Sequence, residues 1–325
     1  MNVRLARAPF AAGDRPGRAC PMEYRYPPSS LDREPELEAE TLYVAGGLYG
    51  NVEALDRLLD LVAADPGAML AFNGDFHWFD ADPADFERIE AAVSKHARLR
   101  GNVETEIAGE DSGAGCGCAY PSDVGDADVE RSNEILDRLR ETARAFPARR
   151  EALAGLPMNL VARVGDARVG LVHGDASSLA GWGFAHDRLD DPAHRRWIDS
   201  AFEASRVDVF ACSHTCVPAT RLFEAGGRAV AVANNGATGM PNFRGSLAGI
   251  VTRVSVSPAP RGRLYGACVA GVHVEAVAVD YDAASFRRRF LAQWPAGSPA
   301  HDSYFRRIES GPAFDPARAA PSAAP

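Results

Sequence analysis

The sequence predicts a layered α/β sandwich built on two mixed sheets. Two observations lead to this fold class: apolar strand-like segments alternate with helix-like segments early in the chain, and consecutive strands follow after Thr220. With 325 residues, 46% of them hydrophobic and 24% charged, the chain is long and apolar enough to bury a complete core. The composition therefore excludes a largely disordered chain, a collagen-like repeat and a small disulfide scaffold.

The alternating part starts with an apolar strand at 41–45 that runs into two glycines. Asn51 is a favourable N-cap for the next helix, in which leucines recur at helical spacing up to Val62. A second buried strand is expected at 68–72. The later elements are expected, in chain order, as helices at 83–97 and 128–146, strands at 161–164, 169–172, 207–211, 221–224, 228–233, 248–255 and 272–279, and a last helix at 282–293.

The chain divides into three regions. Residues 1–38 are rich in arginine, proline and acidic residues without periodicity, which predicts a flexible leader. A single domain is expected over 39–295, with an insertion at about 105–127 that carries a Cys-Gly-Cys segment. Residues 296–325 form a C-terminal extension, in which the tail from Gly311, with its alanine- and proline-rich end, is expected to be unstructured.

Charge and cysteine content narrow the partners and the compartment. The chain has 35 Lys and Arg against 44 Asp and Glu, a formal net charge of −9. A surface this acidic disfavours nonspecific binding to nucleic acid or anionic membranes, so we expect neither as a partner. Six cysteines are too sparse for a disulfide framework, and we find no signal peptide or membrane-spanning run. We therefore expect a cytoplasmic protein whose ligand is a small molecule.

Polar residues directly follow four of the expected strands. These strand ends carry Asp75, Asn102, His173 and His214, the first two each preceded by a glycine. Ligand sites in α/β sheets collect outside the carboxyl ends of strands, and glycine permits sharp turns there. Imidazole suits Zn, Fe or Ni, and carboxylate and amide oxygens suit Mn as well. The four side chains, called the candidate ligands below, are thus predicted to meet at one divalent or transition metal ion.

These segments resemble, in order and spacing, the five motifs of the calcineurin-like metallophosphoesterases. The matching segments are 46–51, 74–75, 101–104, 172–175 and 213–218, and the resemblance extends over about residues 41–240. The later segment 234–239 is similar to one in the bacterial phosphodiesterase branch. The resemblance implies a two-sheet α/β/β/α sandwich and a metal-dependent hydrolase that cleaves a phosphate mono- or diester with a metal-activated water.

The chain departs from these motifs at three positions. The family holds a first metal with the Asp and His of the first motif and the last His of the fifth, where this chain has Gly47, Tyr49 and Cys216. The ligands of the second metal are all retained, as the four candidate ligands. The resemblance therefore implies one firmly held ion, Mn, Fe, Zn or Ni, at a mononuclear or atypical site. It leaves a second ion open.

Sulfur offers an alternative for the lost half of the site. Cys116 and Cys118 lie in the insertion, and if this loop folds back over the pocket they could join Cys216 and Tyr49 around a softer ion. The other interpretation is a glycine-rich loop with ordinary buried cysteines. The sequence leaves both open.

His77 is the one candidate for a catalytic residue. It lies two residues past Asp75, where it would contact substrate, supply a proton, or instead pack against Trp78. No general acid is assigned, because Val103 stands where many members of the family have a histidine.

Two other functions remain open beside hydrolysis. The loss of half the metal ligands favours a non-catalytic module that binds phosphate or a nucleotide on the same fold. The cysteines of the insertion favour a thiolate-metal protein. An assembly of identical subunits is also left open.

Overall fold

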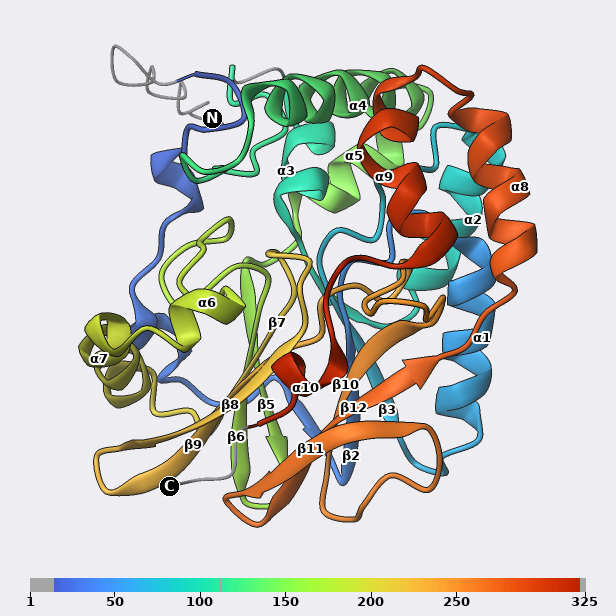
Figure 1. Ribbon diagram of the computed structural model, residues 1–325. Helices are drawn as coiled ribbons and strands as arrows, with labels where there is room; N and C mark the ends of the chain where they lie inside the picture. Colours follow the sequence, from blue (N-terminus) through green and yellow to red (C-terminus); the bar gives the residue numbers. More distant parts are fainter. Residues whose placement is uncertain (1–14, 111–112, 322–325) are drawn as a thin grey trace.

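The computed structural model describes residues 15–110 and 113–321. These residues fold into two six-stranded mixed sheets packed face to face, with helices on both outer sides (Figure 1). Between the sheets lies an aliphatic layer that includes Val44, Leu171 and Val254. Because successive strand residues point to opposite faces, each strand gives alternate side chains to this layer and to its helix-covered face. The α/β/β/α sandwich confirms the predicted fold class.

The first sheet has the strand order β11-β12-β10-β2-β3-β4. Its strands are, in that order, β11 (Arg263–Val269), β12 (Val272–Val279), β10 (Gly249–Ser255), β2 (Thr41–Ala45), β3 (Met69–Asn73) and β4 (Ala97–Leu99). The last three run parallel. In Figure 1 the helices α1 (Val52–Ala63), α2 (Pro83–Val93) and α8 (Ala283–Gln293) lie on its outer side. As predicted, Asn51 caps α1, because its side chain accepts a hydrogen bond from the Ala54 N–H at 2.9 Å.

The second sheet has the strand order β1-β5-β6-β7-β9-β8. Its strands are β1 (Leu37–Ala39), β5 (Asn159–Val164), β6 (Ala167–Val172), β7 (Val209–Cys212), β9 (Arg228–Asn234) and β8 (Ala219–Ala225). On its outer side lie α6 (His186–Leu189) and α7 (Arg195–Ser205) (Figure 1). The 3-10 turns are η1 (Met22–Tyr24), η2 (Pro28–Leu31) and η3 (Pro192–His194), and the last two contact α7. Since β6, β7 and β9 are parallel, their carboxyl ends lie at one edge of the sheet.

Four helices gather at one end of the sandwich (Figure 1). They are α3 (Asn102–Ala108), α4 (Asp126–Arg144), α5 (Pro147–Ala154) and α9 (Pro299–Ser310). The short helix α10 (Pro316–Ala319) returns to β8. Because α3 begins directly after β4, this is the end where the parallel strands finish. Among the helices of the described residues, none combines the length and the apolar composition needed to cross a bilayer.

The N-terminal segment differs from the sequence prediction. A flexible leader is predicted over 1–38, but residues 15–38 pack on the domain: Tyr24 and Leu31 are buried, and β1 pairs in parallel with β5. The Tyr24 hydroxyl also donates a hydrogen bond to Glu106 at 2.6 Å. Isolated apolar residues in a polar segment give no periodic signal, so the sequence does not reveal this packing. Residues 1–14 lie outside the described residues.

Other differences concern the ends of elements. The helix predicted at 83–97 ends at Val93, because a turn precedes β4. The extension 296–325 contains α9, which packs against α4 and α8. The tail from Gly311 is predicted to be unstructured, but it contains α10, and its Phe314 and Ala319 are buried. Residues 322–325 lie outside the described residues. The boundaries of the 39–295 domain stay a prediction.

Candidate metal centre

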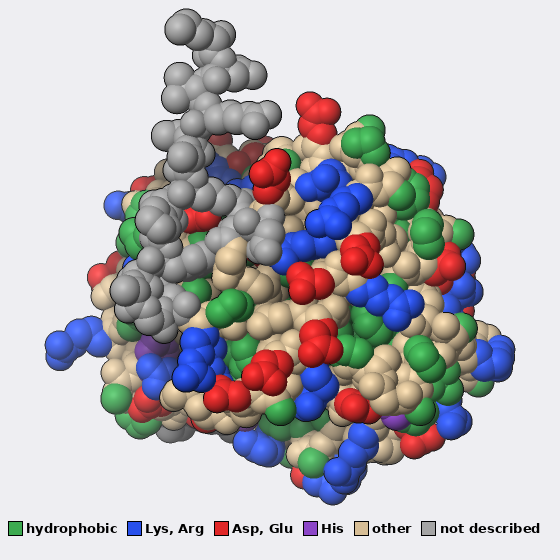
Figure 2. Space-filling model, turned by 90° about the horizontal axis from the view of Figure 1, so that it is seen from above, with side chains coloured by type: hydrophobic (Ala, Val, Ile, Leu, Met, Phe, Trp, Pro, Cys, Tyr) green, Lys and Arg blue, Asp and Glu red, His purple; other side chains and the backbone are tan. Residues whose placement is uncertain are grey.

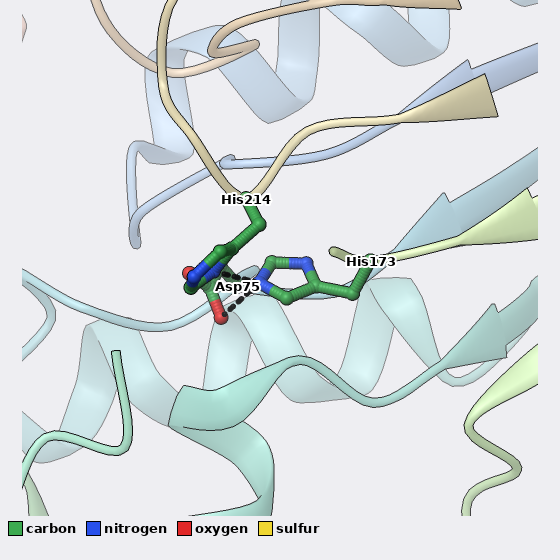
Figure 3. A group of neighbouring side chains, drawn as sticks. All are labelled: Asp75, His173 and His214. Carbon is green, nitrogen blue, oxygen red and sulfur yellow. Dashed lines mark hydrogen bonds and ion pairs between the residues drawn. The ribbon is translucent and has the colours of Figure 1, made fainter. Parts of the chain in front are cut away.

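The structure brings the four candidate ligands together at the carboxyl ends of four strands. Asp75 follows β3, Asn102 begins α3 after β4, His173 follows β6 and His214 follows β7. His173 Nε2 lies 3.3 Å from Asp75 Oδ1, 3.1 Å from Asn102 Oδ1 and 3.1 Å from His214 Nδ1. Figure 3 shows Asp75 and both imidazoles meeting at this point. Spacings of this size suit the edges of one metal coordination sphere.

Hydrogen bonds on the outer side of each ring assign which atoms face this point. His173 Nδ1 lies 2.9 Å from the Asn73 carbonyl oxygen, and His214 Nε2 lies 3.0 Å from the Cys118 carbonyl oxygen. A carbonyl only accepts, so we assign the ring protons to these two nitrogens. His173 Nε2 and His214 Nδ1 are then unprotonated, and their lone pairs face each other. Metal-bound histidines are oriented by outer hydrogen bonds of this kind.

The amide of Asn102 is oriented in the same way. Its Nδ2 donates a hydrogen bond to the Cys116 carbonyl oxygen at 2.9 Å, which turns Oδ1 toward His173. The meeting point is therefore surrounded by two imidazole lone pairs, an amide oxygen and a carboxylate oxygen. While both rings are neutral, none of these atoms can donate a hydrogen bond to another, and all four side chains are buried. A cation satisfies such a group, and the residues fit a metal ion.

The pKa values of the two imidazoles shift in opposite directions. Burial lowers the pKa of His214 to about 3, and the positive charge that His173 can carry adds to the effect. His214 is therefore neutral, the form that binds metals. Burial also opposes the charged form of His173, but Asp75 and the Asn73 carbonyl outweigh it and raise the pKa of this ring. His173 Nε2 thus lies where a positive charge is favoured.

Glu104 holds the loop that presents Asp75. The N–H groups of Asp75 and Gly101 both donate to Glu104 Oε2 at 2.8 Å, and the Phe76 N–H donates to Oε1 at 3.0 Å. Burial, with the charge of Asp75, raises the pKa of Glu104 to about 7. Asp75 has a left-handed backbone, φ 52°, which costs a non-glycine residue roughly 1–2 kcal/mol. A Cβ at position 101 would lie 2.2 Å from Asp75 Oδ1, so glycine is required there.

The half of the site that would hold the first metal is filled by a side chain. A Cβ at Gly47 would lie 2.8 Å from Tyr49 Cζ, so the tyrosine ring covers position 47. The Tyr49 hydroxyl lies 2.8 Å from Cys216 Sγ. Burial raises the pKa of Tyr49 well above its usual value and also raises that of Cys216. Both groups are thus neutral, and we call Gly47, Tyr49 and Cys216 the filled half.

The insertion brings one of its two cysteines to the site. Cys118 lines the pocket described below, whereas Cys116, also buried, is not among the residues that line it. Within the described ranges, the only group of three His, Cys, Asp or Glu side chains close enough to share an ion is Asp75, His173 and His214. Cys118, Cys216 and Tyr49 nevertheless line the same pocket, so a site rebuilt with sulfur stays a hypothesis.

His77 does not reach the pocket, which corrects its interpretation as a catalytic residue. Its ring is fully buried, with Nδ1 2.5 Å from Asp80 Oδ2 and Nε2 3.5 Å from Glu90 Oε2. It stacks on Phe86 at 4.1 Å and not on Trp78. Burial lowers its pKa, but the two carboxylates outweigh this and raise the pKa to about 10. His77 is the cation of a buried ion-pair network.

A pocket of about 200 Å³ opens beside the candidate ligands. The residues that line it are Tyr49, Asp75, Trp78, Asn102, Val103, Cys118, Tyr120, Trp182, His214, Thr215, Cys216 and Tyr304. Sequence analysis missed Tyr120, Trp182 and Tyr304. They come from the insertion, from the loop after β6 and from α9, so no shared motif or spacing could have found them.

Comparison with known proteins gives relatives by structure only. No family model matches the chain, and no curated protein sequence is significantly similar to it. The hypothetical protein PH1004 from Pyrococcus horikoshii OT3 is 15% identical, with a TM-score of 0.56, over 84% of this chain and 99% of that one. A metallophosphoesterase from Sphaerobacter thermophilus is 16% identical, with a TM-score of 0.52, over 84% and 100% of the two chains. At such identities the likeness concerns the fold.

The chain has the two-sheet fold of these two structures, one of which is a metallophosphoesterase, and this confirms the fold that the motif resemblance implies. It carries on that fold a buried Asp-His-His group that is suited to a metal ion.

Proposed function

We propose that the protein is a metal-dependent phosphoesterase that hydrolyses a small phosphate ester at a single metal ion. The observation that carries this proposal is the group of buried candidate ligands, which turn only lone pairs toward one another. Without a metal ion, only a proton on His173 Nε2 relieves the repulsion among these donor atoms, so the group is suited to hold a cation. The two nitrogen and two oxygen donors suit Mn, Fe, Zn or Ni.

The ion and the residues around it would have different roles in the reaction. When bound, the ion lowers the pKa of a water molecule and stabilises negative charge on the phosphate oxygens. Glu104 holds the Asp75 loop in place through backbone hydrogen bonds. On the opposite side, Tyr49 has a protonated hydroxyl that bonds to Cys216 Sγ, and it would donate to a phosphate oxygen only by leaving the sulfur. Val103 contributes no proton donor at its place in the wall.

Two features favour a small molecule over a polymer as substrate. The pocket, at about 200 Å³, is smaller than most ligand pockets, which hold about 300–1,000 Å³. On the face shown in Figure 2, the acidic and basic side chains of the described residues are mixed, without the continuous basic stripe that binds nucleic acid.

A second function is favoured by the filled half. Because Tyr49 covers position 47, the site holds fewer ligands than a two-metal hydrolase uses. A non-catalytic module that binds a phosphate ester through one ion would need no more than this. Turnover separates the two proposals: the module binds phosphate esters in the presence of metal and hydrolyses none.

Metal analysis combined with an ester assay tests the main proposal. Protein purified without chelator is expected to hold about one metal ion per chain and to hydrolyse bis-p-nitrophenyl phosphate or p-nitrophenyl phosphate with added Mn, Fe, Zn or Ni. His173→Ala should lose both the ion and the activity, because it removes a ligand. His273→Ala, a histidine on β12 outside the site, is the matched control. Absence of metal with no gain on adding any of the four ions would overturn the proposal.

A further inference from the structure

Aromatic rings form much of the wall of the pocket beside the candidate ligands, called the metal pocket below. Trp78, Tyr120, Trp182 and Tyr304 line it together with Tyr49. They form neighbouring pairs: the ring centroids of Tyr120 and Trp182 are 6.0 Å apart, and those of Trp78 and Tyr304 are 6.4 Å apart. The rings come from separate parts of the chain and meet only here. Such a wall offers flat apolar surface to a ligand next to the metal.

Trp182 is fixed directly beside the candidate ligands. Its Nε1 donates a hydrogen bond to the Cys118 carbonyl oxygen at 3.0 Å, and the same oxygen accepts from His214 Nε2 at 3.0 Å. The Trp182 and His214 rings lie edge to face, with centroids 5.4 Å apart. One carbonyl therefore sets the position of both a metal ligand and an aromatic surface. A group attached to a phosphate at the metal would lie within reach of this indole ring.

The charge of the pocket limits the charge of its ligand. Asp75 is the one acidic residue in the wall, and neither Lys nor Arg lines it among the described residues. Arg307 lies behind the wall, where its guanidinium donates to the carbonyl oxygens of Pro241 and Cys216 at 2.7 and 3.0 Å. With a divalent ion bound, one negative charge on the ligand and that of Asp75 together balance the charge of the ion. A second negative charge would be buried without a partner, which is costly.

From these three observations we propose that the substrate is a phosphodiester carrying an aromatic ester group, whose ring packs against Trp182. The proposal rests on the proposed function for the metal but concerns the pocket wall. The diester supplies the single negative charge that the site accepts. Its ring takes the apolar surface, and the small volume admits one ring and a phosphate more readily than an extended chain.

Equilibrium binding of three unreactive or slowly reacting esters separates the two parts of the proposal. Methyl phenyl phosphate, dimethyl phosphate and phenyl phosphate are titrated by calorimetry into the full protein with Mn at about pH 8, where phenyl phosphate is doubly charged because its second pKa is about 6. We expect methyl phenyl phosphate to bind about tenfold more tightly than dimethyl phosphate, the scale of aromatic stacking. It should also bind more tightly than phenyl phosphate, which has the same ring and one more charge.

Two variants locate the effect. Trp182→Leu should weaken binding of methyl phenyl phosphate about tenfold and leave dimethyl phosphate and metal content unchanged. Trp197→Leu is the matched control, because Trp197 is similarly part-buried and lines a neighbouring pocket outside the metal pocket. Equal affinity for the methyl phenyl and dimethyl esters, or an unchanged affinity in Trp182→Leu, overturns the aromatic subsite. Tighter binding of phenyl phosphate overturns the diester assignment. Since binding is read without turnover, a loss of the proposed hydrolase activity would be seen separately.

Discussion

The two halves of the metal centre differ in what their side chains offer. In one half, the candidate ligands turn four electron-pair donors toward a point close to His173 Nε2. In the filled half, a neutral phenol and a neutral thiol bond to each other at 2.8 Å, and the ring of Tyr49 covers Gly47. Both halves have strained backbone, since Asp75, Tyr49 and Cys216 all have positive φ.

The two halves share a strained backbone but differ in what their side chains contact. Strained backbone persists only where the surroundings over-determine it, and here it persists on both sides. The filled half thus has positive-φ backbone as the other half does, while its side chains pack against each other. The other half keeps both the shape and the outer hydrogen bonds that orient ligands. We conclude that the side chains, more than the backbone, set the difference between the halves.

Exchanging the side chains of the filled half gives the largest effect we expect. In the triple variant Gly47→Asp, Tyr49→His, Cys216→His, removal of the tyrosine ring opens position 47, and three ligand side chains take its place. Asp and His tolerate positive φ better than most residues. Metal content should rise from about one to about two ions per chain, measured by elemental analysis. Tyr49→His alone, the control, should stay near one; a triple variant that also stays near one would mean that the backbone no longer supports a second ion.

The second prediction concerns His77, whose protonated ring serves stability, in contrast to His173 and His214, whose rings face the metal position. His77→Leu leaves the buried carboxylates of Asp80 and Glu90 without their shared cation, although Glu90 keeps Arg98 at 2.6 Å. Breaking a buried pair in this way costs about 3–5 kcal/mol of the free energy of unfolding, which urea titration measures. Metal content should not change. His96→Leu, a half-buried histidine nearby, is the control.

A different result would restore the interpretation of His77 drawn from the sequence. If His77→Leu kept its stability but lost ester hydrolysis with the metal still bound, the residue would take part in the chemistry. The ion-pair network predicts the opposite pattern, lower stability with metal content retained.

The sequence could predict the fold and the candidate ligands because both depend on local signals. Apolar strands are indicated by composition, and Asp75, His173 and His214 each follow one of them. Asn102 follows the short strand β4, which begins where a helix is expected. The aromatic wall could not be predicted, because Tyr120, Trp182 and Tyr304 belong to no motif and meet only in the folded chain. The same holds for His77, whose partner Glu90 lies on α2 and reaches it through packing. Long-range contacts of single residues leave no periodic trace in a sequence.

The smallest expected effect tests whether Tyr49 is a ligand or a filler. Tyr49→Phe keeps the ring over Gly47 and removes only the hydroxyl that bonds to Cys216. Loss of one such hydrogen bond costs about 0.5–1.5 kcal/mol in unfolding free energy, and metal content should stay at about one ion. Cys216→Ser, which retains a hydrogen-bonding partner for the tyrosine, should change stability less. A loss of metal in Tyr49→Phe would instead show that the phenol oxygen binds the ion. The filled half would then be a second, unusual ligand set, since a ring that merely occupies space can lose its hydroxyl without loss of the metal.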